Sequence, residues 1–158
     1  MLEIGQDAPD FTLPDHRGGR FALSAHKGKP VVVSFYCEDG TDGCEVENRE
    51  FSALASDFAA LGTELVAISP QDVESHRKFA ARNDFAHPLL ADTDLTANKA
   101  YDVWQMKKLW GREYMGTIRV TYLVDADGKI AGVFHARRIK GHAATVLEAA
   151  RALQSGAR

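Results

Sequence analysis

Residues 30–36 form an apolar run that leaves no polar face. They read Pro-Val-Val-Val-Ser-Phe-Tyr, so β-branched and aromatic side chains fill most positions. A run of this kind is typical of a strand that is covered on both sides, as in a central sheet between two layers. Residues 64–69 have the same character and end at Pro70. The chain is therefore predicted to fold around a buried central sheet.

Helical patterns separate the predicted strands. One apolar stripe at helical spacing follows Cys44 and ends before Gly62; it comprises Phe51, Leu54, Ala55, Phe58 and Leu61. Three more segments favour helices: residues 73–83, residues 95–103, and the C-terminal segment, in which Val146, Leu147, Ala150 and Leu153 share one face. Short strands are predicted at residues 87–91, 120–124 and 129–134, the last two joined by an Asp-Ala-Asp-Gly turn. This order predicts an α/β fold with a mixed sheet and helices on both faces.

Size and charge narrow the classes of protein further. The 158 residues fit one domain, covering residues 1–158. The net charge of -3 and the lack of a basic stripe argue against a nucleic-acid partner. No apolar run approaches the roughly 20 residues of a membrane span, so no membrane partner is expected. The first five residues lack the features of a signal peptide, which predicts a cytoplasmic protein.

The chain contains two cysteines, Cys37 and Cys44. Cytoplasmic thiols are kept reduced, so a catalytic, redox-sensing or inert role is expected rather than a structural disulfide. No histidine lies at ligand spacing from them, and no metal site is predicted. Cys44 follows a glycine-containing loop and begins a helix, whose free N–H groups and dipole stabilise a thiolate. Thr41 offers a hydroxyl to the sulfur or to an incoming oxygen. Spacing alone leaves an inert thiol as probable as a reactive one.

Four acidic residues near Cys44 oppose a thiolate. A neighbouring carboxylate raises the pKa of a thiol, and the residues concerned are Glu38, Asp39, Asp42 and Glu45. A cation from elsewhere in the chain is then required. The residues themselves do not indicate which arginine supplies it.

Several segments resemble the peroxiredoxin family. The stretch Cys37-Glu-Asp-Gly-Thr41-Asp-Gly-Cys44 is similar to the family signature Pro-x-x-x-Thr-x-x-Cys. Residues 140–143 resemble the start of the last helix in the bacterioferritin comigratory protein, or peroxiredoxin Q, subfamily. Further likenesses occur in order along nearly the whole chain, at residues 8–13, 68–76, 89–92, 100–104 and 114–125.

This resemblance implies a fold, an activity and a set of roles. The fold is thioredoxin-like, and the activity is reduction of hydrogen peroxide and organic hydroperoxides. Cys44 is similar to the peroxidatic cysteine, Thr41 to the active-site threonine, and Arg119 to the arginine that a strand brings to the thiolate. No metal or organic cofactor is implied. A thioredoxin-type protein or another thiol is the implied reductant, and the chain is expected to be a monomer or a weak dimer.

The sequence departs from the family pattern at two places. Cys37 replaces the signature proline, and Arg49 stands where the subfamily often has its resolving cysteine. We therefore predict that Cys37 resolves the Cys44 sulfenic acid as an intramolecular disulfide. The alternatives are a one-cysteine peroxidase reduced by an outside thiol and a non-enzymatic redox sensor or holdase. A disulfide oxidoreductase is disfavoured, since that chemistry favours Cys-x-x-Cys.

Other residues receive weaker interpretations. The aromatic residues Trp104, Trp110 and Tyr114 border the active-site mouth or, more often at such spacings, pack in the core or rim. Glu47 and Asn48 lie one turn beyond Cys44, and neither is assigned a role.

Overall fold

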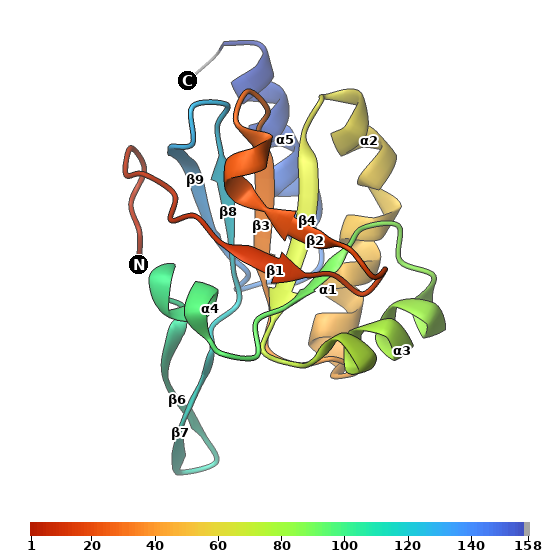
Figure 1. Cartoon of the computed structure of the whole chain (residues 1–158). Coiled ribbons are helices and arrows are strands. Elements are labelled where there is room, and N and C mark those ends of the chain that lie inside the picture. Colours follow the sequence, from red (N-terminus) through yellow and green to blue (C-terminus); the bar gives the residue numbers. More distant parts are fainter. Residues whose placement is uncertain (157–158) are drawn as a thin grey trace.

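A mixed five-stranded sheet forms the centre of the protein, whose computed structural model describes residues 1–156 (Figure 1). The strand order is β5-β4-β3-β8-β9. Strands β3 (Val31–Phe35), β4 (Glu64–Ser69) and β5 (Leu89–Ala91) are parallel, whereas β8 (Val120–Val124) and β9 (Ile130–His135) are antiparallel to their neighbours. All residues of β3 and β8 are buried, as expected for strands with layers on both sides. The predicted mixed sheet is confirmed.

Helices cover both faces of this sheet. One face carries α1 (Asp42–Ala53), α2 (Ala55–Ala60), α3 (Val73–Asn83) and α5 (His142–Gln154). The other face carries α4 (Thr96–Ala100), the 3-10 helix η1 (Leu23–His26) and the hairpin of β1 (Thr12–Pro14) and β2 (Arg20–Ala22). No helix within residues 1–156 combines the length and apolarity that crossing a bilayer requires.

The apolar stripe predicted after Cys44 is present, but two consecutive helices, α1 and α2, form it. The sequence predicts a continuous helix, but the backbone at Leu54 (φ -100°, ψ 5°) leaves the helical region and separates α1 from α2. Phe51 and Phe58 lie on either side of this break. Both are fully buried, with ring centroids 6.2 Å apart. The bend therefore keeps the stripe against the sheet.

A second hairpin, β6 (Trp104–Leu109) and β7 (Arg112–Thr117), projects from the body (Figure 1). The sequence pattern does not predict this hairpin, because most of its residues are exposed and it has no buried face to produce an alternating pattern. Residues 114–125 were predicted to include one strand that carries Arg119. Instead, β7 pairs with β6 while β8 pairs with β3 and β9, so the chain changes sheets at Ile118 and Arg119. Arg119 thus lies in the connection just before β8.

Candidate active site

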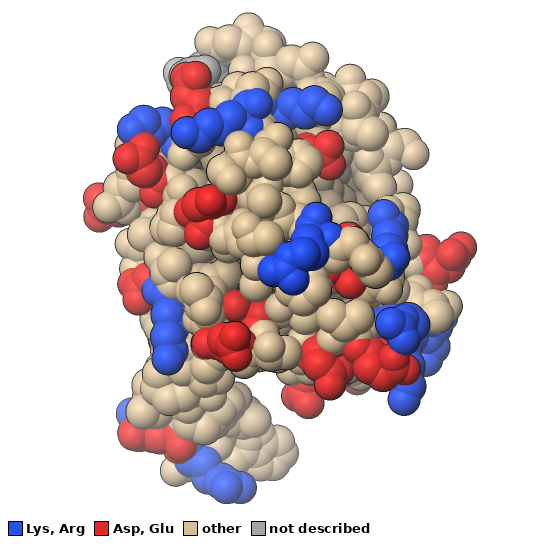
Figure 2. Space-filling model, in the orientation of Figure 1, with Lys and Arg blue, Asp and Glu red and all other residues tan. Residues whose placement is uncertain are grey.

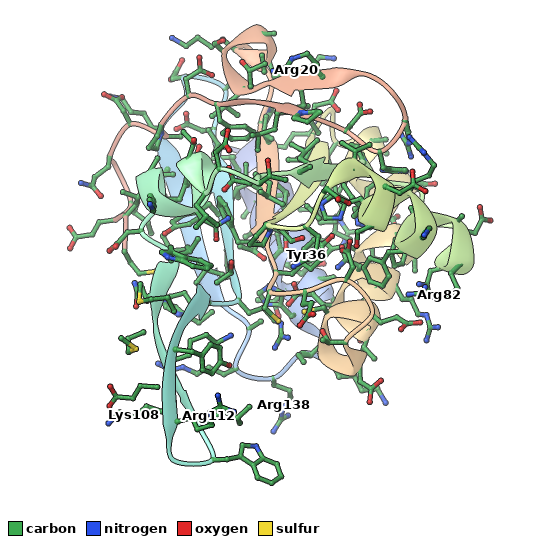
Figure 3. The ribbon with its side chains drawn as sticks, turned by 60° about the horizontal axis from the view of Figure 1, so that its bottom comes forward. Arg20, Tyr36, Arg82, Lys108, Arg112 and Arg138 are labelled. Atoms are coloured by element: carbon green, nitrogen blue, oxygen red, sulfur yellow. The ribbon has the colours of Figure 1, made fainter. Side chains whose placement is uncertain are left out.

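Strand β3 and helix α1 bring the two cysteines together. The strand ends beside Tyr36, whose position Figure 3 marks, and α1 begins five residues after Cys37. The Sγ atoms of Cys37 and Cys44 lie 2.9 Å apart, and both residues are free thiols. Cys44 is fully buried and Cys37 is partly exposed. One sulfur is therefore shielded at the helix start while the other borders solvent.

Arg119 lies against both sulfurs. Its Nη2 atom is 3.2 Å from Cys44 Sγ and 3.6 Å from Cys37 Sγ. Gly43 permits this approach, since a Cβ atom at that position would lie 3.1 Å from Arg119 Nη2 and 2.9 Å from Ile139 Cδ1. A glycine at position 43 thus leaves the space that the Arg119 guanidinium occupies beside the sulfurs.

The two thiols are electrostatically unlike. The hydrogen bond from the Cys37 thiol lowers the pKa of Cys44; burial opposes this, but the hydrogen bond from Arg119 lowers it further. The same hydrogen bond and burial raise the pKa of Cys37. A single proton is thus shared by the pair and held on Cys37, which leaves Cys44 as the thiolate.

Thr41 is the N-cap residue of α1, but its side chain makes neither a capping hydrogen bond nor a hydrogen bond to the Cys44 sulfur. Its hydroxyl donates a hydrogen bond to the Glu38 carbonyl oxygen at 3.0 Å. A hydroxyl carries one proton, so it serves either this carbonyl or the Cys44 sulfur at one time. The observed geometry is the bond to Glu38.

A buried carboxyl group, Glu47, faces Arg119 from the second turn of α1. Its side chain is 1% exposed, and its Oε2 atom lies 3.6 Å from Arg119 Nε; neither atom has a hydrogen-bond partner. Burial raises the pKa of Glu47 to about 8, although the charge of Arg119 opposes the shift. Glu47 is therefore mostly neutral at pH 7. The sequence offered one indication that Glu47 is buried near the site. It lies three residues after Cys44 and four before Phe51, which places it on the inward face of the helix.

Three buried side chains link Glu47 to the start of α5. His142 Nε2 lies 2.8 Å from Thr121 Oγ1, Thr121 donates to Ser34 Oγ at 3.1 Å, and Ser34 donates to Glu47 Oε1 at 3.5 Å. Because the single Thr121 proton is directed to Ser34, the His142 nitrogen must be the donor to Thr121. Every donor in this row points toward Glu47.

Asp39 is the other buried carboxyl group near the cysteines, and it is fully paired. It accepts hydrogen bonds from Tyr36 Oη (2.6 Å), Ser75 Oγ (2.7 Å) and His76 Nδ1 (2.6 Å). The Nε2 atom of His76 lies 3.0 Å from the Leu90 carbonyl oxygen, so both ring nitrogens face oxygen atoms. Burial raises the pKa of Asp39, but these partners outweigh it and leave the pKa below its ordinary range.

The remaining acidic neighbours do not oppose the thiolate strongly. Glu38 and Asp42 are exposed, and Glu45 pairs with Arg49 at 2.6 Å. Asn48, on the buried side of α1, instead supports the helix start. Its Nδ2 atom donates to the Cys44 carbonyl oxygen, and its Oδ1 atom faces His87 Nε2, each at 2.9 Å. Within residues 1–156 no cluster of three or more His, Cys, Asp or Glu side chains is placed to hold a metal ion.

The chain is similar to known proteins over most of its length. Residues 4–133 match the AhpC/TSA family model. The chain is 37% identical over 147 residues to peroxiredoxin Bcp of Bacillus subtilis, covering 93% of this chain and 94% of that protein.

Solved structures show the same fold. Peroxiredoxin Q of Xanthomonas campestris superposes with a TM-score of 0.88 at 33% identity and covers 98% of each chain. The bacterioferritin comigratory protein of the same organism, studied for its alkyl peroxide reduction activity, has a TM-score of 0.89 at 31% identity, covering 96% of this chain and 99% of that one. Peroxidoxin BcpB of Mycobacterium tuberculosis has a TM-score of 0.85 at 33% identity, covering 97% and 99%. The predicted thioredoxin-like fold is confirmed.

Proposed function

The chain belongs to the AhpC/TSA family and is a peroxiredoxin, a thiol peroxidase, and from this premise we propose how its residues divide the work. Cys44 is the peroxidatic cysteine, Thr41 and Arg119 position the peroxide, and Cys37 resolves the oxidised sulfur. One observation carries this proposal: two sulfurs 2.9 Å apart share one guanidinium, 3.2 Å from Cys44.

In the first step the Cys44 thiolate attacks one peroxide oxygen. An S–O bond forms, the O–O bond breaks with its electron pair, and the second oxygen leaves as hydroxide or alkoxide to be protonated. Sulfur is oxidised to sulfenic acid and the peroxide is reduced to water or an alcohol. Arg119 is permanently charged and offers a fixed fork of donors, so it stabilises both the thiolate and the charge on the leaving oxygen.

In the second step Cys37 attacks the Cys44 sulfenic acid, forming the disulfide and releasing water. The thiolate that raised the pKa of Cys37 is then gone, because a sulfenic acid is neutral. Arg119 Nη2, 3.6 Å from Cys37 Sγ, is free to stabilise a Cys37 thiolate instead. One cation thus serves the two sulfurs in turn.

The disulfide forms here without unwinding of α1. The two sulfurs need to close from 2.9 Å to about 2.05 Å, a shift within the reach of side-chain rotation. Hydrogen bonds hold the intervening loop to the α3 side of the fold. Three side chains donate to the Asp39 carboxylate, and the Asp39 N–H donates to Gln71 Oε1 at 3.0 Å. These bonds favour a loop that keeps its folded conformation through the proposed cycle.

An outside thiol completes the cycle by reducing the disulfide, and we propose a thioredoxin-type protein for this step. The alkyl peroxide reduction activity studied in the related bacterioferritin comigratory protein supports organic hydroperoxides as substrates, and hydrogen peroxide is proposed beside them. We also propose a single domain, supported by the one five-stranded sheet that joins residues 31–135. The monomeric or weakly dimeric state and the cytoplasmic location stay predictions.

Mass spectrometry after one equivalent of peroxide tests the assignment. We expect a Cys37–Cys44 disulfide in the native chain, a persistent sulfenic acid in Cys37→Ser, and no peroxide consumption by Cys44→Ser. A native chain that keeps its sulfenic acid without the disulfide contradicts the resolving role and favours the one-cysteine peroxidase. Slow, stoichiometric oxidation without turnover favours the redox sensor.

A further inference from the structure

The hairpin of residues 104–117, here called the arm, concentrates exposed apolar side chains. It stands clear of the body at the lower left of Figure 2. Eight large apolar side chains are exposed in the described part of the chain, and five of them lie on the arm: Met106 (55%), Leu109 (54%), Trp110 (90%), Tyr114 (43%) and Met115 (45%). Single exposed apolar residues need no explanation, but a cluster of this kind indicates an interaction surface.

Apolar side chains occur on both faces of the arm. Met106 lies opposite Met115, Tyr114 lies opposite Lys107, and neighbouring positions alternate between the two faces. The methionines thus share one face, while Leu109 and Tyr114 share the other. A flat protein surface would cover only one face of a hairpin. Apolar residues on both faces and at the tip instead suit a fluid apolar medium that surrounds the tip.

The tip residue is held in an unfavourable backbone conformation. Trp110 and Gly111 have φ values of +56° and +75°, so both central residues of the turn are left-handed. Asparagine, aspartate or glycine normally occupies such a two-residue hairpin turn. A bulky side chain there is strained, and the indole is 90% exposed, so it gains no packing within the chain. The strain points to a use for the exposed ring.

Cations lie directly behind the apolar tip. Lys107, Lys108 and Arg112 occupy the arm with one carboxylate, Glu113, so the arm has a net positive charge although the whole chain carries -3. Lys108 lies 3.6 Å from Glu113 on the exposed surface, and Lys107 donates to the Thr117 carbonyl oxygen, which leaves Arg112 as the unpaired cation of the arm in the described residues. Figure 3 shows Lys108 and Arg112 at the outer end of the arm, and Arg138, from the connection between β9 and α5, directed to the same end of the molecule. An apolar tip with cations behind it is complementary to an anionic lipid surface, which offers phosphates above an acyl region.

We propose that the arm docks this peroxiredoxin on the surface of an anionic bilayer. Leu109 and Trp110 enter the interfacial region, and Lys108 and Arg112 contact lipid phosphates. The expectation of no membrane partner rests on the lack of a spanning run, which peripheral docking does not need. Because β7 leads through Ile118 to Arg119, docking holds the thiol site on the membrane side of the molecule. A hydroperoxide on an acyl chain is polar and is drawn toward the same interface.

Vesicle binding by the full chain tests this proposal. We expect co-sedimentation with phosphatidylcholine vesicles that contain phosphatidylglycerol, weaker binding to phosphatidylcholine alone, and release by salt. Trp110→Gly relieves the left-handed strain, so it keeps the fold and the rate of hydrogen peroxide reduction while vesicle affinity falls by about tenfold or more. Lys108→Gln with Arg112→Gln removes the preference for phosphatidylglycerol. Ile4→Ser, at another exposed apolar residue, is the matched control and keeps full binding.

Three outcomes overturn the proposal. The first is a native chain that stays in the supernatant with both kinds of vesicle, or a Trp110→Gly variant that binds as well as the native chain. The second is self-association of the native chain that Trp110→Gly abolishes without any vesicle binding, which makes the arm an interface between copies. The third is a KM for a protein reductant that rises in Trp110→Gly while vesicle binding is absent, which makes the arm a reductant-docking surface.

Discussion

The loop before Cys44 and the helix after it each bury one carboxyl group, and the two groups are in opposite states. Asp39, in the loop, accepts bonds from Tyr36, Ser75 and His76, and its pKa is lowered. Glu47, in α1, has an unpaired Oε2 atom, and burial raises its pKa to about 8. The pairing that a carboxyl group finds, rather than its distance along the chain, decides its charge.

This contrast explains how an acidic neighbourhood supports a thiolate. Three hydrogen bonds satisfy the Asp39 carboxylate, which anchors the loop, while the largely neutral Glu47 leaves Arg119 to the sulfurs. Negative charge is therefore kept where it stabilises the fold and removed where it would oppose Cys44.

Asp39→Asn is expected to have the largest effect, because it breaks the paired side of the comparison. Asparagine replaces the carboxylate that accepts hydrogen bonds from Tyr36, Ser75 and His76, and each buried donor left without a partner costs about 1–3 kcal/mol. Urea unfolding measures the loss. Asp42→Asn, at the exposed start of α1, is the control and should change the free energy of unfolding by less than about 1 kcal/mol. Equal losses in both variants would mean that the Asp39 network does not anchor the loop.

Arg119→Met removes the cation that both sulfurs and Glu47 face. We expect the second-order rate of peroxide reduction to fall by about 10²–10³-fold, as on loss of one preorganised donor at a reacting centre. The pKa of Cys44 should rise as well, which pH-dependent alkylation detects. Arg137→Met, on an exposed loop, should change neither quantity. An unchanged rate in Arg119→Met would remove the arginine from the mechanism.

Glu47→Gln sharpens the comparison through pH. Because the folded pKa of about 8 exceeds the ordinary value of 4.5, the native chain holds a proton that the unfolded chain has released. The stabilisation is complete below about pH 4.5 and is lost toward pH 8, by at most about 1.4 kcal/mol per pH unit. Glutamine should flatten this part of the profile of unfolding free energy, whereas Glu45→Gln should retain it. An identical slope in native and Glu47→Gln chains would show that Glu47 is ionised throughout.

Gly43→Ala is expected to have the smallest effect, because flexible ends of side chains absorb the new methyl group. The added Cβ lies 3.1 Å from Arg119 Nη2 and 2.9 Å from Ile139 Cδ1, so both must shift by a few tenths of an ångström. We expect the rate of peroxide reduction to fall by about three- to tenfold. The free energy of unfolding in urea should not change, because the Asp39 hydrogen bonds are untouched. Gly40 cannot serve as the control because of its φ of +82°, so Ser52→Ala on the same helix is used. A native rate in Gly43→Ala would mean that the guanidinium position is not critical.

Local pattern predicted the elements that have a buried face. The apolar runs at 30–36, 64–69 and 120–124 are strands of the sheet, and residues 73–83 form α3. The arm escaped prediction, since neither of its faces is buried and alternation is the signal of a half-buried strand. Leu54 escaped as well, because the apolar stripe continues through the bend.

The sequence likewise predicted some residues of the candidate site and not others. Resemblance indicated Cys44, Thr41 and Arg119, and the structure places Arg119 on the sulfurs. The opposite charge states of Asp39 and Glu47 could not be predicted from the sequence, because the side chains that contact them come from distant segments. His76 is 37 residues from Asp39, and Arg119 is 72 residues from Glu47. Only the folded chain shows which carboxyl group meets a donor.

The contact between the two sulfurs has a consequence for survival under oxidative stress. When no segment has to move before the disulfide closes, the sulfenic acid is consumed at the rate of the chemistry itself. A second peroxide then finds little of it to convert to the irreversible sulfinic acid. If Cys37 resolves Cys44 as proposed, a short loop with cysteine at each end protects Cys44 against overoxidation when peroxide is in excess.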